Sequence, residues 1–421
     1  MTMLCPRKHE GLNLADVSQR VINRITDRAR GKVSDVKDLE PPFLPLIRNE
    51  PDIFSPDCNV AREEIAYGRW ALPQLLKRLN SDNQERCLMA INSLARLIHD
   101  PEKLYEAVEL RIIDRIYDLL KTKKVIIKEA ALIVLGIACN HYVGSDATIA
   151  AEAKSRWDSE NLFESFKDEP TCDDEINSPI TYVNPVDVGR LAIILSDEYP
   201  SVRYKAANVV NNISKSWHGP VGLHENNFIP VLLERAEFEN IDEIKIEVLQ
   251  ALHGCLLHDQ YKALSLGGLT LLDNLLRSDN TSIRAASAEC IAALELHPLG
   301  RTIAIEINLI ESLMPLLYSE EIAELESAAG CICFITITTP SKLKAAEPEL
   351  IDRLVFLASY KHSLKLQLNA VKALTNISEA PNGRSILLSN YFTQIKSIPG
   401  DHDECLNRSL QTLLQVIAWK P

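Results

Sequence analysis

The stretch from Gly268 to Leu294, GLTLLDNLLRSDNTSIRAASAECIAAL, contains one complete unit of a pattern that recurs along most of this chain. Its first part places leucines on one stripe at helical spacing, and its second part does the same with Ile283, Ile291 and Leu294. Between the two, short polar side chains at 278–280 compete for backbone hydrogen bonds, which favours a turn followed by an N-cap. The stretch therefore predicts a hairpin of two helices.

Copies of the first helix recur at nearly constant spacing. The intervals between them are 41, 41, 40, 41 and 41 residues, and one interval of 75 residues equals a period plus an insertion of 34. The copies are ALPQLLKRL from Ala71, IIDRIYDLL from Ile112, DVGRLAIIL from Asp187, FIPVLLERA from Phe228, LIESLMPLL from Leu309, LIDRLVFLA from Leu350 and a weaker one near Phe392.

A helical period of this length is typical of armadillo and HEAT repeats and is too long for tetratricopeptide or ankyrin units. The second helices agree in register, with small residues such as Ala206, Ser287 and Ala370 four places after the first apolar anchor. We therefore expect an all-α protein, an armadillo-type right-handed α-solenoid of about seven to eight repeats. A stack of this kind also explains how 421 residues avoid a single large core.

The predicted organisation has five parts. An N-terminal extension (1–66) with a basic amphipathic helix and a proline-rich arm precedes repeats 1–2 (67–150). An acidic, disordered insertion (151–185) separates these from repeats 3–7 (186–391), and a C-terminal half-repeat (392–421) caps the stack. The insertion contains KDEPTCDDEINSP from Lys167, whose spacing does not match a calcium-binding EF-hand loop, so no metal site is expected there.

Composition narrows the classes of partner. A net charge of −13 opposes binding to nucleic acid or anionic lipid, so a protein partner is expected. Ten cysteines without a CxxC pair fall mostly in helical stripes, which is typical of buried thiols in a reducing compartment. No stretch approaches the roughly 20 apolar residues of a membrane span, and the first residues lack the apolar region of a secretory signal.

The sequence contains no motif that predicts catalysis. A phosphate-binding glycine loop, an HExxH helix and a GxSxG turn are all missing, so we expect no enzyme activity, cofactor, metal or small-molecule substrate. His99, His141, His218, His258 and His297 each fall near the end of a second helix, in different repeats. We interpret them as capping groups that meet the free carbonyls and negative end of the helix dipole.

Two sets of residues are candidates for binding partners. In the N-terminal extension, three arginines recur every four residues on a predicted amphipathic helix, either to dock on an acidic surface or simply as a solvated face. In the repeats, polar residues of the second helices are expected to line a concave groove, where side-chain amides can bond an extended peptide. The first set is Arg20, Arg24 and Arg28, and the second is Asn92, Arg96, Asn208, Asn212, Lys215, Gln250, Lys372 and Asn376.

No continuous asparagine ladder runs along that groove. Equivalent positions in other repeats hold Gly136, Gly254, Ala293 and Phe334. Where nuclear-import adaptors carry tryptophans one turn before the ladder, this chain has Asn208 and Lys372, which disfavours an import function. The alternative to groove binding is that these are ordinary exposed polar residues.

Several strings in the chain resemble the radial spoke head protein 14 homologues of cilia and flagella. They are AYGRWALPQLL from Ala66, LIHDPEKLYEAVE from Leu97, AAGCICFITITTPSKLKAAE from Ala328, LNAVKALTNISEAPNGRSILL from Leu368 and VIAWKP from Val416, and the resemblance spans most of 65–421. The long N-terminal extension and the acidic insertion depart from that family's pattern. The resemblance implies a non-enzymatic component of the radial spoke in the ciliary or flagellar axoneme, part of the cytoskeleton, with other spoke or axonemal proteins as partners.

Three functions remain open at this stage. The first is an axonemal scaffold that binds spoke proteins through its groove and its N-terminal extension. The second is a cytosolic armadillo adaptor for a peptide or protein cargo. The third is a helical enzyme, which would require titratable groups that converge in the groove with perturbed pKa values.

Overall fold

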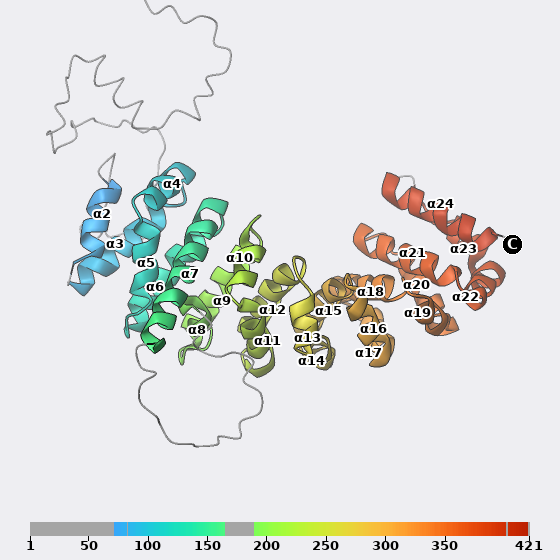
Figure 1. Cartoon of the computed structure of the whole chain (residues 1–421). Coiled ribbons are helices and arrows are strands. Elements are labelled where there is room, and N and C mark those ends of the chain that lie inside the picture. The colour runs from blue at the N-terminus through green and yellow to red at the C-terminus, as the bar shows by residue number, and fades with distance from the viewer. Residues whose placement is uncertain (1–70, 82, 165–188, 401–402, 420–421) are drawn as a thin grey trace, which may run out of the picture. The chain divides into compact units, whose positions relative to one another are not determined.

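The computed structural model describes residues 71–81, 83–164, 189–400 and 403–419, with the backbone alone for 157–164. All regular structure in these ranges is helical (Figure 1). The chain divides into two compact units, Met1–Arg115 and Ile116–Pro421. The helix predicted to carry Arg20, Arg24 and Arg28, the proline-rich arm, and residues 165–188 of the acidic insertion lie outside the described ranges.

The first unit contains a helical hairpin followed by a further helix. Helices α2 (Ala71–Leu79) and α3 (Gln84–Leu97) pack against each other through Leu72, Leu75 and Leu79 on one side and Ile91 and Leu94 on the other. Asn83 caps α3, because its side chain accepts hydrogen bonds from the backbone of Glu85 and Arg86. Helix α4 (Pro101–Glu109) follows, and the boundary between the units falls within α5 (Ile112–Leu119).

The second unit contains the remaining helices in a regular succession. Their bounds are α6 Val125–Ala138, α7 Tyr142–Glu164, α8 Arg190–Ile194, α9 Pro200–Ser214, α10 Gly219–Glu225, α11 Phe228–Phe238, α12 Asp242–Leu256, α13 Tyr261–Ser265, α14 Gly268–Leu275, α15 Thr281–Leu294, α16 Pro298–Glu306, α17 Leu309–Leu313, the 3-10 helix η4 Pro315–Tyr318, α18 Ile322–Ile335, α19 Thr339–Lys344, α20 Pro348–Ala358, α21 Leu364–Ser378, α22 Pro381–Ile386, the π-helix η5 Leu387–Tyr391, α23 Phe392–Lys396 and α24 Glu404–Ala418.

The hairpin predicted between Gly268 and Leu294 is confirmed as α14 and α15. Asn280 is the N-cap of α15, with its side chain accepting hydrogen bonds from Ser282 and Ile283. Ile283, Ser287, Ile291 and Leu294 are all buried, as their spacing predicts. The local rules that distinguish turn, cap and apolar stripe were sufficient here.

A third helix that the two-helix prediction missed follows the long second helix, and it is short except in the case of the 23-residue α7. These short helices, among them α10, α13, α16, α19 and α22, follow the long second helix directly. Several begin with proline in the first turn, as at Pro298 and Pro381, where a missing N–H is harmless. Three helices per repeat are characteristic of armadillo rather than HEAT units.

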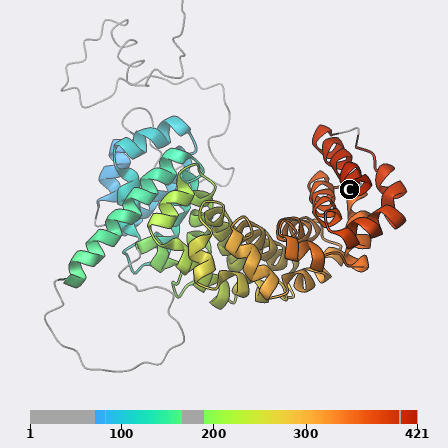
Figure 2. The ribbon, with the colours of Figure 1, turned by 45° about the vertical axis from the view of Figure 1, so that its right-hand side comes forward.

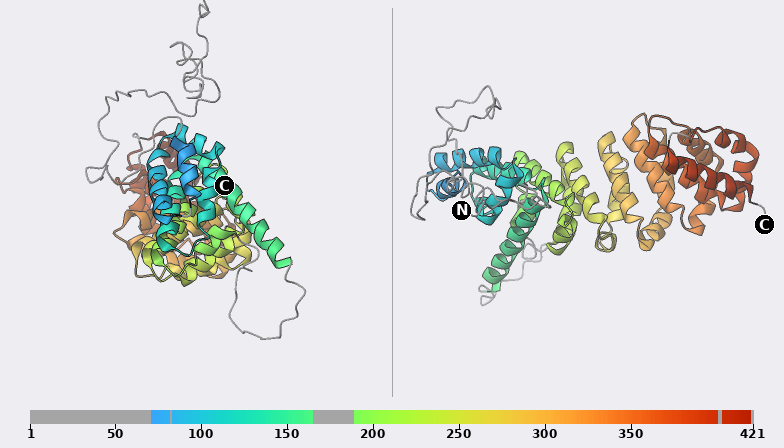
Figure 3. Two further views of the ribbon diagram at one scale, coloured as in Figure 1. Left: turned by 90° about the vertical axis from the view of Figure 1, so that its left-hand side faces the viewer. Right: turned by 90° about the horizontal axis from the view of Figure 1, so that it is seen from above.

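Within the second unit, the long second helices form a continuous inner layer. Helix α6 packs on α9, α9 on α12, and so on through α15, α18, α21 and α24. Figures 2 and 3 show this succession from other directions, with the first helices and the short helices arranged beside it. The core lies between the long second helices and the helices beside them. It consists mainly of Leu, Ile, Val and Ala, with few aromatic side chains.

Two helix boundaries differ from the sequence prediction. The insertion was expected to begin near Glu152, but α7 continues to Glu164, because Glu152 and Ser155 are buried and bound to the chain that follows the insertion. The single helix expected from Leu309 is divided into α17 and η4. Pro315 has no N–H with which to continue the α-helical pattern, and it begins the 3-10 turn.

Candidate functional site: the long-helix face

The predicted groove residues of the first unit lie on α3. Asn92 and Arg96 are four positions apart, which places them on one side of the helix, and both are exposed. Their exposure agrees with a surface role.

In the second unit, three of the predicted residues are exposed on the inner layer of long helices, here called the long-helix face. Gln250 lies on α12 and Lys372 on α21, while Lys215 is the C-cap residue of α9. The helices that carry them belong to one continuous layer. The face can therefore present amide and ammonium groups from several repeats to one partner.

Two of the asparagines predicted to bind a peptide instead donate hydrogen bonds to the preceding long helix. Asn212 donates from Nδ2 to the Gly136 carbonyl at 3.1 Å and to Asn208 Oδ1 at 3.4 Å. Asn376 likewise donates to the Cys333 carbonyl at 2.9 Å. These amides tie each long helix to the one before it, which leaves fewer donors for a peptide than the sequence interpretation assumed.

Further ties between long helices were not predicted at all. Asn211, only 2% exposed, donates to Glu247 Oε2 at 2.7 Å and to Gln250 Oε1 at 2.9 Å, and Asn369 donates to the Glu326 carbonyl at 3.0 Å. The signal that could have revealed them is glycine at facing positions. A Cβ on Gly254 would lie 2.5 Å from Ser214 Oγ, so these helices approach too closely for a side chain there.

Charges on this face are arranged across three consecutive helices. Lys365 of α21 contacts Glu289 of α15 and Glu326 of α18, each at 3.4 Å. His253 of α12 lies nearby, and burial lowers the pKa of its imidazole, against the influence of Glu289. The ionic contacts of Lys365 thus connect α21 with both of the long helices before it.

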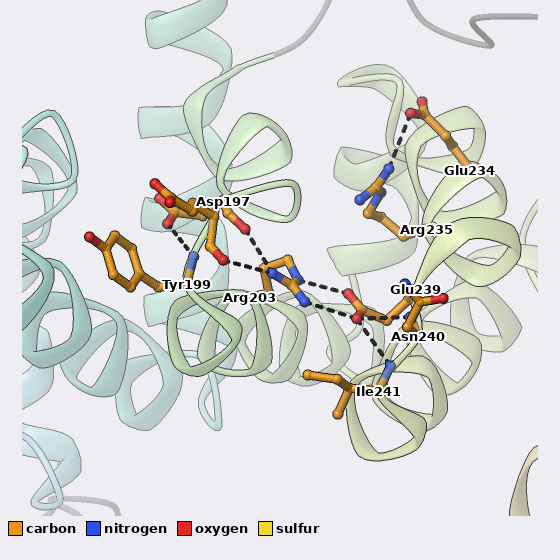
Figure 4. Close-up of polar contacts among 9 residues, drawn as sticks. Asp197, Tyr199, Arg203, Glu234, Arg235, Glu239, Asn240 and Ile241 are labelled. Carbon is orange, nitrogen blue, oxygen red and sulfur yellow. Dashed lines mark hydrogen bonds and ion pairs between the residues drawn. The ribbon is translucent and has the colours of Figure 1, made fainter.

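An arginine clasp joins two repeats near the beginnings of α9 and α12 (Figure 4). Arg203 donates from Nε and Nη2 to the two carboxylate oxygens of Glu239, at 2.8 and 3.0 Å, and from Nη1 to the Asp197 carbonyl at 3.0 Å. Glu239 also accepts from the backbone N–H groups of Asn240 and Ile241. Burial alone would raise the pKa of Glu239, but these hydrogen bonds lower it below its ordinary value.

A second buried carboxyl holds the two ends of the insertion together. Glu152 accepts hydrogen bonds from Tyr117, from the backbone N–H of Leu191 at 2.9 Å and from that of Ala192 at 3.2 Å. Burial raises the pKa of this carboxyl to about 7, although both backbone donors oppose the shift. Glu152 thereby caps α8 from a helix that precedes the insertion.

Cys139 and Cys255 are buried, while His297 takes part in a helix cap. Burial raises the pKa of Cys139 and Cys255 to about 12, so neither is a ready nucleophile or ligand. His297 does cap a helix, but at the start of α16, where its Nδ1 accepts from Leu299 N–H, rather than at the end of α15 as predicted. In the described ranges, no three His, Cys, Asp or Glu side chains gather as metal ligands would.

No helix among the described residues has both the length and the apolar character needed to cross a membrane. A scan against protein-family models found no match. Among solved structures, an engineered protein from the Northeast Structural Genomics Consortium superposes with a TM-score of 0.56 at 18% identity, over 83% of this chain and 89% of its own. A second engineered protein gives a TM-score of 0.50 at 18% identity, over 63% and 96%.

A designed armadillo repeat protein gives a TM-score of 0.50 at 16% identity, over 63% of this chain and 99% of its own. Likeness at these identities bears on the fold alone. With the helical repeats described above, it shows that this chain is an all-α, armadillo-like solenoid.

Proposed function

We propose that this chain is a non-enzymatic scaffold of the radial spoke in cilia and flagella, which binds other axonemal proteins through its long-helix face. The observation that carries the binding role is the exposure of polar side chains on successive helices of one layer, such as Gln250 on α12 and Lys372 on α21. A stack of repeats can present such a layer without a central cavity.

The axonemal assignment rests on the strings that resemble the radial spoke head protein 14 family. Two of them lie on this layer: the string from Ala328 includes much of α18, and the string from Leu368 includes most of α21. The part of the first string on α18 is almost entirely buried, so it bears on the packing of the layer, whereas the string on α21 includes the exposed Lys372.

Localisation tests the axonemal part of the proposal. A tagged copy in ciliated cells should remain with the axoneme after detergent extraction, because a spoke component is held by protein contacts. Complete release into the detergent-soluble fraction would instead favour the cytosolic adaptor.

A paired variant tests the face. Gln250→Glu together with Lys372→Glu should reduce capture of axonemal proteins in a pull-down at least fivefold, because both residues are exposed and a glutamate at position 250 still offers Asn211 an acceptor. An unchanged melting temperature would show that the stack is intact. A matched variant, Gln394→Glu with Lys396→Glu, makes the same change in charge at exposed residues of α23, outside the long helices, and should bind as the wild type does.

A further inference from the structure

Two junctions between repeats share the same ion pair. In each, the fourth residue of a long helix is a cation that pairs with an acid three residues before the next long helix. Lys128 of α6 pairs in this way with Asp197, and Arg203 of α9 pairs with Glu239. In both pairs the cation lies in the first turn of its long helix.

The junction between α15 and α18 lacks this pair, as does the preceding one between α12 and α15, where the corresponding residues are Lys245 and Ser278. Arg284 is the fourth residue of α15, but the position three residues before α18 holds Ser319, which carries no charge. The acid is supplied instead by Glu324, from inside the first turn of α18. At this junction the acid therefore belongs to the next long helix itself and not to the segment that precedes it.

Glu324 is only 1% exposed, yet its hydrogen-bonding capacity is unused. Arg284 Nη2 lies 2.7 Å from Glu324 Oε1, but the contact is not aligned as a hydrogen bond, and neither carboxylate oxygen accepts one within the described residues. Arg284 directs Nη1 to the carbonyls of Ser278 and Asp279 instead, at 2.8 and 3.1 Å. A buried acceptor without a donor is costly, so this carboxylate favours a ligand that donates.

Glu324 forms part of the lining of an open cleft of about 630 Å³. The uncharged Ser278 and Ser319 line this cleft, and Pro315 and Tyr318 of η4 form part of its wall. The break between α17 and η4 at Pro315 therefore contributes to the shape of the cleft.

The charges around the cleft favour a cation. Asp279 and Glu311 line it, are exposed, and take part in no ion pair in the described part of the chain. Of the two lining arginines, Arg284 is engaged with Glu324, and Arg277 lies 3.7 Å from Asp273. The acids of the lining outnumber its cations by one.

We propose that this cleft binds a guanidinium group, the side chain of an arginine presented by a partner protein. A guanidinium offers five N–H donors in a planar fork, which can reach Glu324 on the floor while also meeting Glu311 or Asp279 at the rim. This site lies outside the long-helix face and does not depend on the function proposed for that face.

The test uses the full chain and a capped tripeptide, acetyl-Gly-Arg-Gly-amide, with binding followed by ligand-observed NMR. The matched probe replaces arginine by citrulline, which is nearly the same in shape but has no charge. The arginine peptide should bind at least tenfold more tightly than the citrulline peptide. Equal binding of the two would overturn the proposal.

Three variants locate the binding. Glu324→Gln should weaken it at least tenfold, and Glu311→Gln about threefold. Ser319→Glu should abolish it, because a carboxylate at this position can engage Arg284 as Glu239 engages Arg203 and fill the mouth of the cleft. Glu237→Gln, an exposed acid beside the closed junction, makes the same change in charge and should have no effect.

Melting followed by circular dichroism identifies any variant that fails to fold. If Glu324→Gln does not fold, the variants Glu311→Gln and Ser319→Glu test whether the peptide binds in this cleft. Undiminished binding by Ser319→Glu would place the peptide elsewhere and refute the site.

Discussion

At the junction between α9 and α12, Arg203 binds both carboxylate oxygens of Glu239, whereas at the junction between α15 and α18 the equivalent Arg284 meets Glu324 without an aligned hydrogen bond. The arginines occupy the same position in their helices and bond the same kind of preceding carbonyl. The difference lies in where the acid stands in the next repeat. One junction is closed and structural, and the other leaves an open cleft with an unsatisfied carboxylate.

This comparison shows how a repeat protein can acquire a binding site without altering its fold. Every junction needs packing, but only some need a full set of polar contacts, because neighbouring junctions contribute separately to the stability of the stack. A serine at this position of a junction, as at Ser319, is therefore compatible with the stack. The space that results is available for recognition.

The largest expected effect is loss of the closed clasp. Arg203→Ala should lower the free energy of unfolding by about 4 kcal/mol, because it leaves the buried Glu239 carboxylate without its cation. Chemical denaturation followed by circular dichroism would measure this. Arg408→Ala removes an exposed ion pair within α24 and should cost under about 0.5 kcal/mol. Equal losses in the two variants would contradict the idea that burial decides the value of the clasp.

A slightly smaller effect concerns pH at the junction that Glu152 closes. Because the folded-state pKa of Glu152 is raised from 4.5 to about 7, the folded protein binds a proton more readily than the unfolded chain between these values. Its contribution to stability is present below pH 4.5 and is lost as pH rises through about 7, by up to about 3 kcal/mol.

The difference in stability between the wild type and Glu152→Gln should change with pH over this window, since the variant cannot titrate there. Denaturation of both proteins at pH 5 and pH 8 measures it. A difference that stays constant between these pH values would show that Glu152 keeps an ordinary pKa in the folded protein.

The smallest expected effect is closure of the open junction. Ser319→Glu places a carboxylate where Glu239 stands in its own junction, within reach of Arg284, and should raise the free energy of unfolding by about 1 kcal/mol. Thermal melting would detect the gain, and the exposed Glu320→Gln serves as the control for a change in charge. A loss of stability would mean that the two junctions do not share one geometry.

The repeats could be predicted from the sequence because each depends on local patterns. The apolar spacing in 282–294 and the cap at Asn280 require only residues near one another in the chain. The short third helices were missed because stretches such as Tyr261–Ser265 are too short to display a helical period. The end of α7 was missed because its support comes from Leu191 and Ala192, beyond the insertion.

The candidate binding residues could be predicted only in part, for a similar reason. Exposure of Gln250 and Lys372 follows from their place on a helix. The engagement of Asn212 with the Gly136 carbonyl depends on how closely two helices approach, which no single repeat reveals. The axonemal function and the acid-binding roles of Arg20, Arg24 and Arg28 remain predictions.

The cap that Glu152 provides to α8 has a consequence for engineering. Glu152 of α7 binds the first turn of α8 directly. The position of α8 on α7 therefore does not depend on the length of chain between Glu164 and Gly189. Closing a longer loop adds little entropy cost, on the order of 0.6 kcal/mol for each doubling. A fluorescent protein, an affinity tag or a cleavage sequence inserted there should leave the solenoid able to fold, and new chain termini at this point would offer a route to circular permutation.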